Sequence, residues 1–568
     1  MAGMSMRKAP AIVVLGPGSL ATARRIQALY PQASIHGLAG RTEQVDRQYE
    51  SFGDTLRALY QQDTPIIALC AAGIVIRTLA PLLTEKGVEP PVLAVAEDGS
   101  AVVPLLGGLA GVNLMAREMA EALDVVPAIT TSGELRFGTC LLNPPQGYAL
   151  DDLEQGKRFV SDLLAGEMVR IEGSAPWLDA AQLPASDTAQ RTIHVGCSLR
   201  PSSRDELRIY PRSVLVAVDA AAPALADLVH EALHAAGIAQ QSLACLLACE
   251  TQMAEPSLHE AARELGVALR FAPEATSLEH MAAHMLGGAE VRTQSGLAMA
   301  IAPEPIVPAR IGRGRGRLAV IGLGPGAAEL MVPAVKAELA RAEDILGYET
   351  YVRMAGPFRD DQVQHCTDNR EEMQRARHAF ELAARGRSVV VVSSGDPGVF
   401  AMAAAVLEAL HESTDPAWHR VELEILPGVS ASLATAAQAG APLGHDFCVM
   451  SLSDNLKPWS IIEKRLDLAA QADLVLAFYN PISRSRPWQL GQALDIVRRH
   501  REAHTPVVLG RDIGRPGQTL KVVTLGELQP DMVDMRTMVL VGSSTTCTFG
   551  RAGGGQWVYT PRWYGNKP

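Results

Sequence analysis

Residues 318–339 read LAVIGLGPGAAELMVPAVKAEL. An aliphatic run, a glycine turn and a helical apolar spacing follow one another, which is typical of a buried parallel strand that leads into a covering helix. Residues 11–29, AIVVLGPGSLATARRIQAL, repeat this order. Both halves of the chain are therefore predicted to open with a strand–turn–helix unit.

Further apolar runs alternate with helical stretches in both halves of the chain. They include residues 65–73, 91–97, 213–220, 388–398, 421–430, 473–481, 505–512 and 537–544. This alternation predicts a multidomain α/β fold, with Rossmann-like α/β domains in the first half and ligand loops at the carboxyl ends of the strands.

With 568 residues, the chain is too long for one hydrophobic core. Polar pieces between residues 148 and 192 predict one break, and residues 303–317, PEPIVPARIGRGRGR, predict a linker with solvated arginines. An alternative is that these arginines contact an anionic ligand or a partner. The predicted domains are residues 1–148, 149–302 and 318–568, with the linker at 303–317 and two lobes at about 318–426 and 427–568.

Charge and composition exclude several classes of partner. A formal net charge of −11 argues against a duplex nucleic acid, because neutralising phosphates takes an excess of Lys and Arg. We find neither a long apolar run typical of a membrane span nor a secretory leader, so we expect a cytoplasmic protein. The eight cysteines include no C-x-x-C pair, and Cys245 and Cys249, one helical turn apart in an apolar stretch, are predicted to be buried free thiols. No metal site is predicted.

Three glycine turns follow strands in the second half: Gly322 to Gly326, Ser393 to Phe400, and Leu426 to Ser432. Such turns bring backbone N–H groups close to a ligand, and the carboxylate of Asp396 suits the ammonium group of an amino acid. An alternative role for Asp396 is a helix N-cap. Because the turns lie at strand ends, we expect them to converge.

The order and spacing of these turns resemble those of the tetrapyrrole methyltransferases that build sirohaem and cobalamin. The segments SDNLKPW, FYNPIS and GRDIGRPG (residues 453–459, 478–483 and 510–517) resemble the precorrin-3B C(17)-methyltransferases within that class. The resemblance implies a two-lobed fold, a homodimer, S-adenosylmethionine as cofactor, and methylation of precorrin-3B at C-17 with ring contraction to precorrin-4. The cobalt-containing form of the substrate is an alternative.

The same resemblance, together with the three turns, indicates the site residues. The cofactor is expected to contact Gly324, Pro325, Gly326, Ser394, Gly395, Asp396, Val399, Phe400, Ser430, Ala431, Tyr479 and Asn480. Donors for the carboxylates of the tetrapyrrole substrate are expected at Asn455, Lys457, Arg484, Arg486, Arg511 and Arg515. Proton transfer during contraction is expected from His445, Asp446 or Asp454.

The glycine turn of the first half, residues 16–19, fits a phosphate or nucleotide loop. The second strand, however, ends at residues 34–37 without the acidic residue that would bind a ribose, which argues against a nicotinamide site.

Residues 11–140, and more weakly 193–302, resemble the cobalamin-pathway family that opens a lactone in cobalt-precorrin-5A and releases acetaldehyde. The family pattern S-G-H-x-G-G-A-N contains a histidine, whereas residues 107–113 read GGLAGVN. The first half is therefore expected either to be a second enzyme or to bind and deliver a tetrapyrrole. Its candidate site residues are Arg77, Glu97, Asp98 and Asn113.

Overall fold

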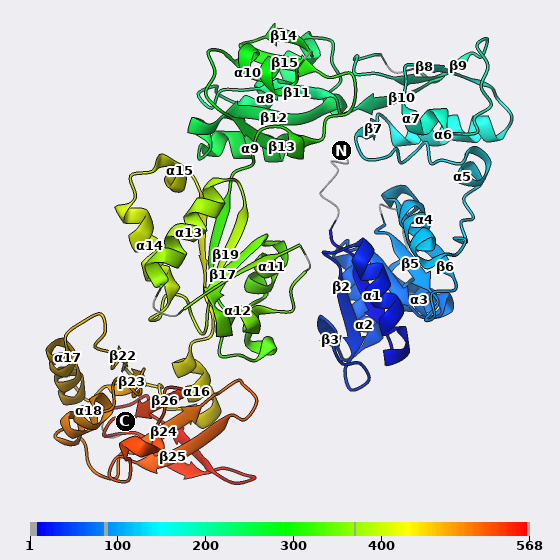
Figure 1. The fold of residues 1–568 in the computed structure, drawn as a ribbon. Helices are drawn as coiled ribbons and strands as arrows, with labels where there is room; N and C mark the ends of the chain where they lie inside the picture. Colours follow the sequence, from blue (N-terminus) through cyan, green and yellow to red (C-terminus); the bar gives the residue numbers. More distant parts are fainter. Residues whose placement is uncertain are drawn as a thin grey trace. The chain divides into compact units, whose positions relative to one another are not determined.

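The computed structural model describes residues 8–83, 89–201, 203–287, 289–359, 361–368 and 371–564. The chain divides into two compact units, Met1–Arg315 and Gly316–Pro568, each of which is described by itself (Figure 1).

The first unit begins with a six-stranded sheet in the order β3-β2-β1-β4-β5-β6, in which only β6 is antiparallel to its neighbour. Helices α1 and α4 cover one face, and α2 and α3 cover the other. This is the doubly wound arrangement that the buried, aliphatic strands predict. The strands are β1 Ala11–Val14, β2 Ser34–Leu38, β3 Arg47–Tyr49, β4 Ile66–Leu69, β5 Val92–Val95 and β6 Val102–Leu106; the helices are α1 Leu20–Leu29, α2 Phe52–Gln61, α3 Ala72–Leu79, α4 Val112–Leu123 and α5 Ser132–Phe137.

A four-stranded sheet, in the order β7-β10-β9-β8, crosses the segment in which the sequence predicts a break. The break at residues 148–192 thus contains regular structure. Its strands are short and alternate in polarity, with Ile193 and Ile209 buried against α6. A pattern of this kind is weaker than a continuous aliphatic run. The elements are β7 Tyr148–Leu150, β8 Val169–Glu172, β9 Arg191–Val195, β10 Glu206–Pro211, α6 Leu153–Leu164 and α7 Pro176–Asp179.

A third sheet, in the order β13-β12-β11-β15-β14, completes this unit. Cys245 and Cys249 lie on its strand β12, so their predicted helical spacing is wrong, because a short apolar run reads alike for a buried strand and a helix. Cys245 is buried and Cys249 is half-buried, and both are free thiols. The elements are β11 Val214–Ala217, β12 Leu243–Cys249, β13 Ala268–Ala272, β14 Glu290–Gln294, β15 Leu297–Ile301, α8 Leu225–Ala235, α9 Pro256–Leu265 and α10 Leu278–Met285.

The predicted linker is largely packed against this third sheet. Ile306 and Ile311 are buried in its core, and the guanidinium of Arg313 forms two hydrogen bonds of 2.9 and 2.7 Å with the carboxylate of Glu250. In the second unit, Arg317 pairs with Glu338, Glu422 and Glu424. The prediction of solvated arginines is therefore wrong for Arg313 and Arg317, whose carboxylate partners are far away in the sequence.

The first lobe of the second unit is a parallel sheet in the order β18-β17-β19-β16-β20. Helices α13 and α14 cover one face, while α11 and α12 cover the other (Figure 1). The strands are β16 Arg317–Gly322, β17 Asp344–Tyr348, β18 Val363–Thr367, β19 Ser388–Ser393 and β20 Glu422–Leu426; the helices are α11 Pro333–Arg341, α12 Glu349–Ala355, α13 Glu372–Ala384, α14 Met402–Glu412 and α15 Pro416–His419.

The second lobe contains a mixed sheet in the order β22-β23-β26-β24-β25, in which only β22 and β23 are parallel, and a smaller sheet in the order β21-β28-β27. Strands β24 and β25 are joined by a short loop, which an antiparallel pair allows and a parallel pair does not. The strands are β21 Gly440–Ala441, β22 Phe447–Ser451, β23 Val475–Tyr479, β24 Pro506–Arg511, β25 Thr519–Thr524, β26 Thr537–Val541, β27 Cys547–Gly550 and β28 Gln556–Tyr559; the helices are α16 Ala431–Ala439, α17 Trp459–Gln471 and α18 Gln489–Arg498.

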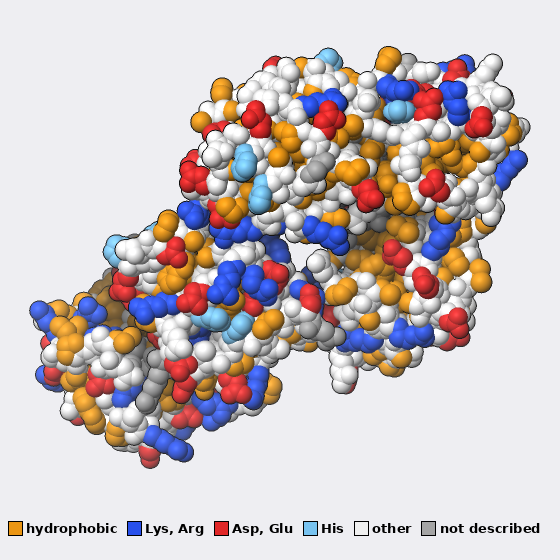
Figure 2. Space-filling view, turned by 45° about the horizontal axis from the view of Figure 1, so that its top comes forward, with side chains coloured by type: hydrophobic (Ala, Val, Ile, Leu, Met, Phe, Trp, Pro, Cys, Tyr) orange, Lys and Arg blue, Asp and Glu red, His pale blue; other side chains and the backbone are white. Residues whose placement is uncertain are grey.

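Among the residues described, no helix has the length and apolar character needed to cross a membrane. Lys and Arg side chains are interspersed with Asp and Glu over the face in Figure 2.

Candidate functional site

The three glycine turns of the second unit meet at the carboxyl ends of β16, β19 and β20. Gly324 and Gly395 exchange two backbone hydrogen bonds, of 3.1 and 2.7 Å. A Cβ atom on Gly428 would lie 2.1 Å from the carbonyl oxygen of Gly395. At position 428 only glycine lets the turns approach this closely, and the predicted convergence of the turns is confirmed.

The carboxylate of Asp396 holds two of these turns together. Its Oδ1 accepts a hydrogen bond of 2.8 Å from the amide of Gly398, and its Oδ2 accepts one of 3.0 Å from the amide of Gly428. The N-cap of the following helix is Ala401, so the N-cap alternative for Asp396 is wrong. One carboxylate oxygen of Asp396 thus binds its own turn and the other binds the neighbouring turn. Asp396 therefore fixes the two turns relative to each other.

The amino end of α16 supplies polar atoms beside these turns. Ser430 is the N-cap, its hydroxyl accepts from the amide of Leu433, and Ala431 is the first helical residue. The Tyr479 hydroxyl donates to the Ser432 hydroxyl and accepts from the Ser432 amide, at 3.1 Å in each case. Tyr479, at the end of β23, is thus bound to the first lobe's third turn.

An exposed aromatic ring lies at the same place. Phe400 has a φ of +53° and is 51% exposed. Its ring meets that of Tyr479 edge to face, with 5.4 Å between the centroids. Val399, before it, is half-buried, and its amide donates to the carbonyl of Asp396. A residue in the left-handed region with an open aromatic face is typical of a ligand site.

Arg515 links the loop after β24 to the first lobe. Its Nε donates to the carbonyl of Pro325 at 3.0 Å, and its Nη2 donates to the Ser394 hydroxyl at 3.1 Å. A Cβ atom on Gly326 would lie 2.6 Å from the Cγ of Arg515. The guanidinium therefore makes intramolecular contacts between the lobes of this unit.

Asn480 and Arg486 form a second cluster at the end of β23. Asn480 has a φ of +50°, and its side-chain amide donates to the Ser451 hydroxyl at 3.0 Å. The carbonyl of Asn480 accepts from Nη1 of the buried Arg486 at 2.9 Å. Burial lowers the pKa of Arg486, whereas Asp454 acts in the opposite direction.

Of the remaining predicted substrate donors, one forms an ion pair with a residue that the structure describes and the others do not. Arg511 pairs with Asp534 at 2.8 Å. Lys457 and Arg484 make no hydrogen bond or ion pair within the described part of the chain, although the ammonium of Lys457 lies 5.8 Å from the centroid of the Phe400 ring. Asn455 is exposed.

A pocket of about 470 Å³ lies between β22 and α17. Its lining is mostly apolar and includes Phe400, Met450 and Leu468. Two cations, Lys457 and Arg465, also line it. Burial lowers the pKa of Lys457, and the positive charge of Arg465 adds to this effect. Arg465 was missed by the sequence reasoning, although it shares a helical face with Ile462 and Leu468.

The three residues predicted to transfer protons do not lie together. His445 and Asp446 precede β22, whereas Asp454 follows it, and a five-residue strand spans roughly 17 Å. Asp454 accepts hydrogen bonds of 3.1 Å from the side chain of Gln489. Tyr479 and Asn480 of the predicted cofactor site lie at the carboxyl end of β23, which runs parallel to β22. Because His445 and Asp446 precede β22, they lie at the opposite edge of this sheet.

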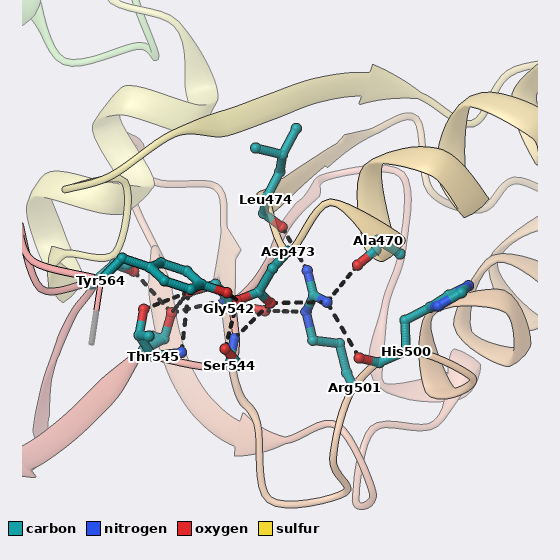
Figure 3. Close-up of polar contacts among 12 residues, drawn as sticks. Ala470, Asp473, Leu474, His500, Arg501, Gly542, Ser544, Thr545 and Tyr564 are labelled. Atoms are coloured by element: carbon teal, nitrogen blue, oxygen red, sulfur yellow. Dashed lines mark hydrogen bonds and ion pairs between the residues drawn. The ribbon is translucent and has the colours of Figure 1, made fainter. Parts of the chain in front are cut away.

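An ion pair between the buried Arg501 and the half-buried Asp473 occupies that amino edge (Figure 3). Arg501 pairs with Asp473 at 3.0 Å and donates to the carbonyls of Ala470 and Leu474. Asp473 also accepts from the Tyr564 hydroxyl at 2.6 Å. These bonds hold Tyr564 against this edge, and their position indicates a structural role.

In the first unit, the predicted residues do not form one cluster. The Asn113 amide is buried and donates to Glu134 and Thr131, at 2.6 and 3.0 Å. Asp98 accepts from its own turn at Ser100. Arg77 and Glu97 are exposed. Asn113 thus makes its amide contacts inside the protein.

Two other features of this unit were not predicted. A pocket of about 580 Å³ lies beside α8, lined by His230, His234 and Gln241 among others. On the four-stranded sheet, Glu172, His194 and Glu206 place possible metal ligands within 4.8 Å of one another. Arg200 pairs with both glutamates, so a guanidinium already balances their charge.

Comparison with known proteins identifies two regions of the chain. Residues 317–529 match the family of tetrapyrrole (corrin/porphyrin) methylases, and residues 54–134 match the family of cobalamin synthesis G N-terminal regions.

Individual relatives match the second unit. A precorrin-3B C(17)-methyltransferase from Sinorhizobium sp is 51% identical over 44% of this chain and 97% of its own length. A probable cobalt-factor III C(17)-methyltransferase from Salmonella typhimurium is 41% identical over 40% of this chain and 93% of its own. The cobalamin biosynthesis protein CobIJ of Mycobacterium tuberculosis is 47% identical over 44% of this chain, and the match spans 48% of that protein. A crystal structure of the methyltransferase CobJ is 52% identical over 43% of this chain and 100% of its own, with a TM-score of 0.41.

The two-lobed α/β unit with three convergent glycine turns is a methyltransferase. The chain belongs to the family of tetrapyrrole (corrin/porphyrin) methylases, and its first unit carries a cobalamin synthesis G N-terminal region.

Proposed function

We propose that the second unit methylates precorrin-3B at C-17 with S-adenosylmethionine as methyl donor, and that ring contraction to precorrin-4 accompanies the transfer. The observation that carries this proposal is the 51% identity to the Sinorhizobium precorrin-3B C(17)-methyltransferase over 97% of that protein. The lower identity of 41% to the Salmonella cobalt-factor III enzyme favours the metal-free substrate over the cobalt-containing one.

The residues of the first lobe fit a cofactor with an amino-acid moiety and an adenosine. The mutual hydrogen bonds of Gly324 and Gly395 hold two turns side by side at the strand ends, and the exposed ring of Phe400 offers an apolar face. Pro325, Gly326, Ser394, Val399, Ser430, Ala431, Tyr479 and Asn480 complete the proposed cofactor site, with Asp396 holding its turns. S-adenosylmethionine supplies an activated methyl group on a sulfonium, so the protein chiefly has to orient the reactants.

For proton transfer we propose Asp454, because it follows β22 on the side of Ser451 and Asn480. Its carboxylate is oriented by Gln489. We expect Asp454→Asn to lower kcat at least tenfold, within the range of general acid–base effects, with the affinity for S-adenosylhomocysteine retained. His445→Gln, at the other edge, should retain both.

The direct test is incubation of the full chain with S-adenosylmethionine and either precorrin-3B or its cobalt-containing counterpart. A product heavier by one methyl group, with release of S-adenosylhomocysteine, is expected from precorrin-3B. Turnover of the cobalt form alone would assign the alternative substrate. The absence of both products would contradict the proposal.

For the first unit we propose a module that binds a tetrapyrrole and delivers it to the methyltransferase. Residues 107–113 lack the histidine of the hydrolase pattern, and the Asn113 amide is engaged internally. Release of acetaldehyde from cobalt-precorrin-5A by the full chain would instead assign a second hydrolase activity. We further propose that the protein is cytoplasmic and forms a homodimer. Light scattering of the purified chain tests the dimer.

A further inference from the structure

The pocket between β22 and α17 combines two chemical characters that few ligands match. Its walls are mainly apolar, from Phe400, Met450 and Leu468. Lys457 and Arg465 add two positive charges to the same lining. A ligand for this pocket must therefore carry anionic groups on an apolar framework.

Neither cation has an anionic partner among the residues that the structure describes. Within the described residues, neither Lys457 nor Arg465 forms an ion pair or a hydrogen bond, whereas the other predicted substrate donors Arg486, Arg511 and Arg515 are all engaged. The net charge of the chain is −11. Lys457 is half-buried and Arg465 is exposed, so both can receive a carboxylate or phosphate from a bound ligand.

The pocket also adjoins the proposed cofactor site. Phe400 belongs to both, since its ring meets Tyr479 on one side and the Lys457 ammonium on another. A ligand held there would share the Phe400 ring with the proposed cofactor site. If a second copy of the chain covered this pocket instead, it would have to place acidic residues against Lys457 and Arg465.

We propose that this pocket binds one rim of the tetrapyrrole, with acetate or propionate carboxylates on Lys457 and Arg465 and ring carbons against Phe400, Met450 and Leu468. This inference rests on the proposed function and adds Arg465 as a specificity residue. Arg465 can bind a carboxylate with two parallel hydrogen bonds, which fixes the orientation of the macrocycle.

The test uses uroporphyrin III, a tetrapyrrole with eight carboxylates, and the full chain. Fluorescence quenching should show that Lys457→Gln and Arg465→Gln each weaken uroporphyrin binding about tenfold, as the loss of a charge-assisted hydrogen bond predicts. Arg465→Lys should restore part of the affinity. Lys464→Gln removes a neighbouring exposed charge on α17 and is the matched control, with affinity unchanged.

Three outcomes separate the possibilities. Unchanged uroporphyrin affinity in the double variant would overturn the pocket assignment, even if precorrin-3B is methylated. A shift from dimer to monomer in Leu468→Asp, with uroporphyrin affinity intact, would also overturn it and identify a subunit interface. Retained S-adenosylhomocysteine affinity in both cation variants, with a raised KM for precorrin-3B, supports it. The uroporphyrin result stands whether or not precorrin-3B is the substrate.

Discussion

The carboxylate of Asp396 and the amide of Gly428 form a 3.0 Å hydrogen bond that joins turns 32 residues apart in the chain. Through this bond, one acidic side chain fixes the relative position of two strand ends.

We expect Asp396→Asn to disrupt the cofactor site, because an amide in that place turns one acceptor into a donor that faces a backbone N–H group. The cost is about 1–3 kcal/mol, which predicts roughly tenfold weaker binding of S-adenosylhomocysteine by calorimetry. Asp415→Asn is the matched control, since Asp415 caps the short helix α15 by a similar bond of 2.8 Å. Equal effects of the two substitutions on ligand affinity would contradict this role.

Gly428→Ala tests the close approach of the turns. The new Cβ atom would lie 2.1 Å from the carbonyl oxygen of Gly395, so the turns must separate. We expect a lower melting temperature and loss of S-adenosylhomocysteine binding. Gly491→Ala is the control, because its Cβ atom would meet only Pro530 at 3.9 Å. Retained ligand binding in Gly428→Ala would show that the site tolerates separated turns.

Arg515→Gln removes the contacts of the β24–β25 loop with Pro325 and Ser394. If Arg515 positions the two lobes, kcat/KM should fall at least tenfold, since misplacement of reacting groups is costly. Arg515→Lys should restore little, because an ammonium lacks the guanidinium's fork. Arg341→Gln, which removes an exposed ion pair with Glu338, should leave kcat/KM unchanged.

The Asp473–Arg501 pair predicts a large effect on stability without an effect on ligand binding. Arg501→Met leaves Asp473 without its buried cation, which typically costs about 3–5 kcal/mol of unfolding free energy in urea. Arg499→Met, whose 59% exposed side chain pairs with Asp467, should cost less than about 1 kcal/mol. Weakened S-adenosylhomocysteine binding in the folded Arg501 variant would assign this edge a functional role.

His36 makes the stability of the first sheet depend on pH. Burial lowers the pKa of His36 from 6.5 to about 4, Arg47 adds to this effect and Asp46 opposes it. The unfolded chain therefore binds the proton first, and stability falls as the pH drops from about 6.5 to about 4, by on the order of 3 kcal/mol.

Hydrogen exchange of the β1 and β2 amides measures this dependence. His36→Gln should flatten it between pH 6.5 and 4. The exposed His411→Gln is the control and should keep the wild-type slope. An unchanged slope in His36→Gln would assign the pH dependence to other groups.

Strong local patterns made much of the fold predictable. The aliphatic strands before Gly16 and Gly324 could be identified because both faces of each are covered. The run from Ile193 predicts a strand, which is β9, but the short strands β7, β8 and β10 could not be identified, since each is only partly apolar. The runs at residues 505–512 and 537–544 of the second lobe are strands as predicted, but their antiparallel direction could not be predicted, because a buried run does not reveal its direction.

The parts of the site that are formed by backbone turns could be predicted from the sequence. The parts that depend on contacts between distant side chains could not. The convergence of Gly324, Gly395 and Gly428 follows from their place at strand ends. Motif position could not reveal that Arg515 bonds to Pro325, because its partner lies 190 residues away. Nor could it place His445 at the opposite edge from Asp454.

The packed segment before the second unit decides where the two units could be separated. Ile306 and Ile311 belong to the core of the third sheet, and Arg313 is paired with Glu250. Cutting the gene at residue 302, where the prolines begin, would strip the upstream product of these anchors. A chimera that exchanges the upstream module for another should therefore place its junction after Arg313, where only Gly314 and Arg315 precede the methyltransferase unit.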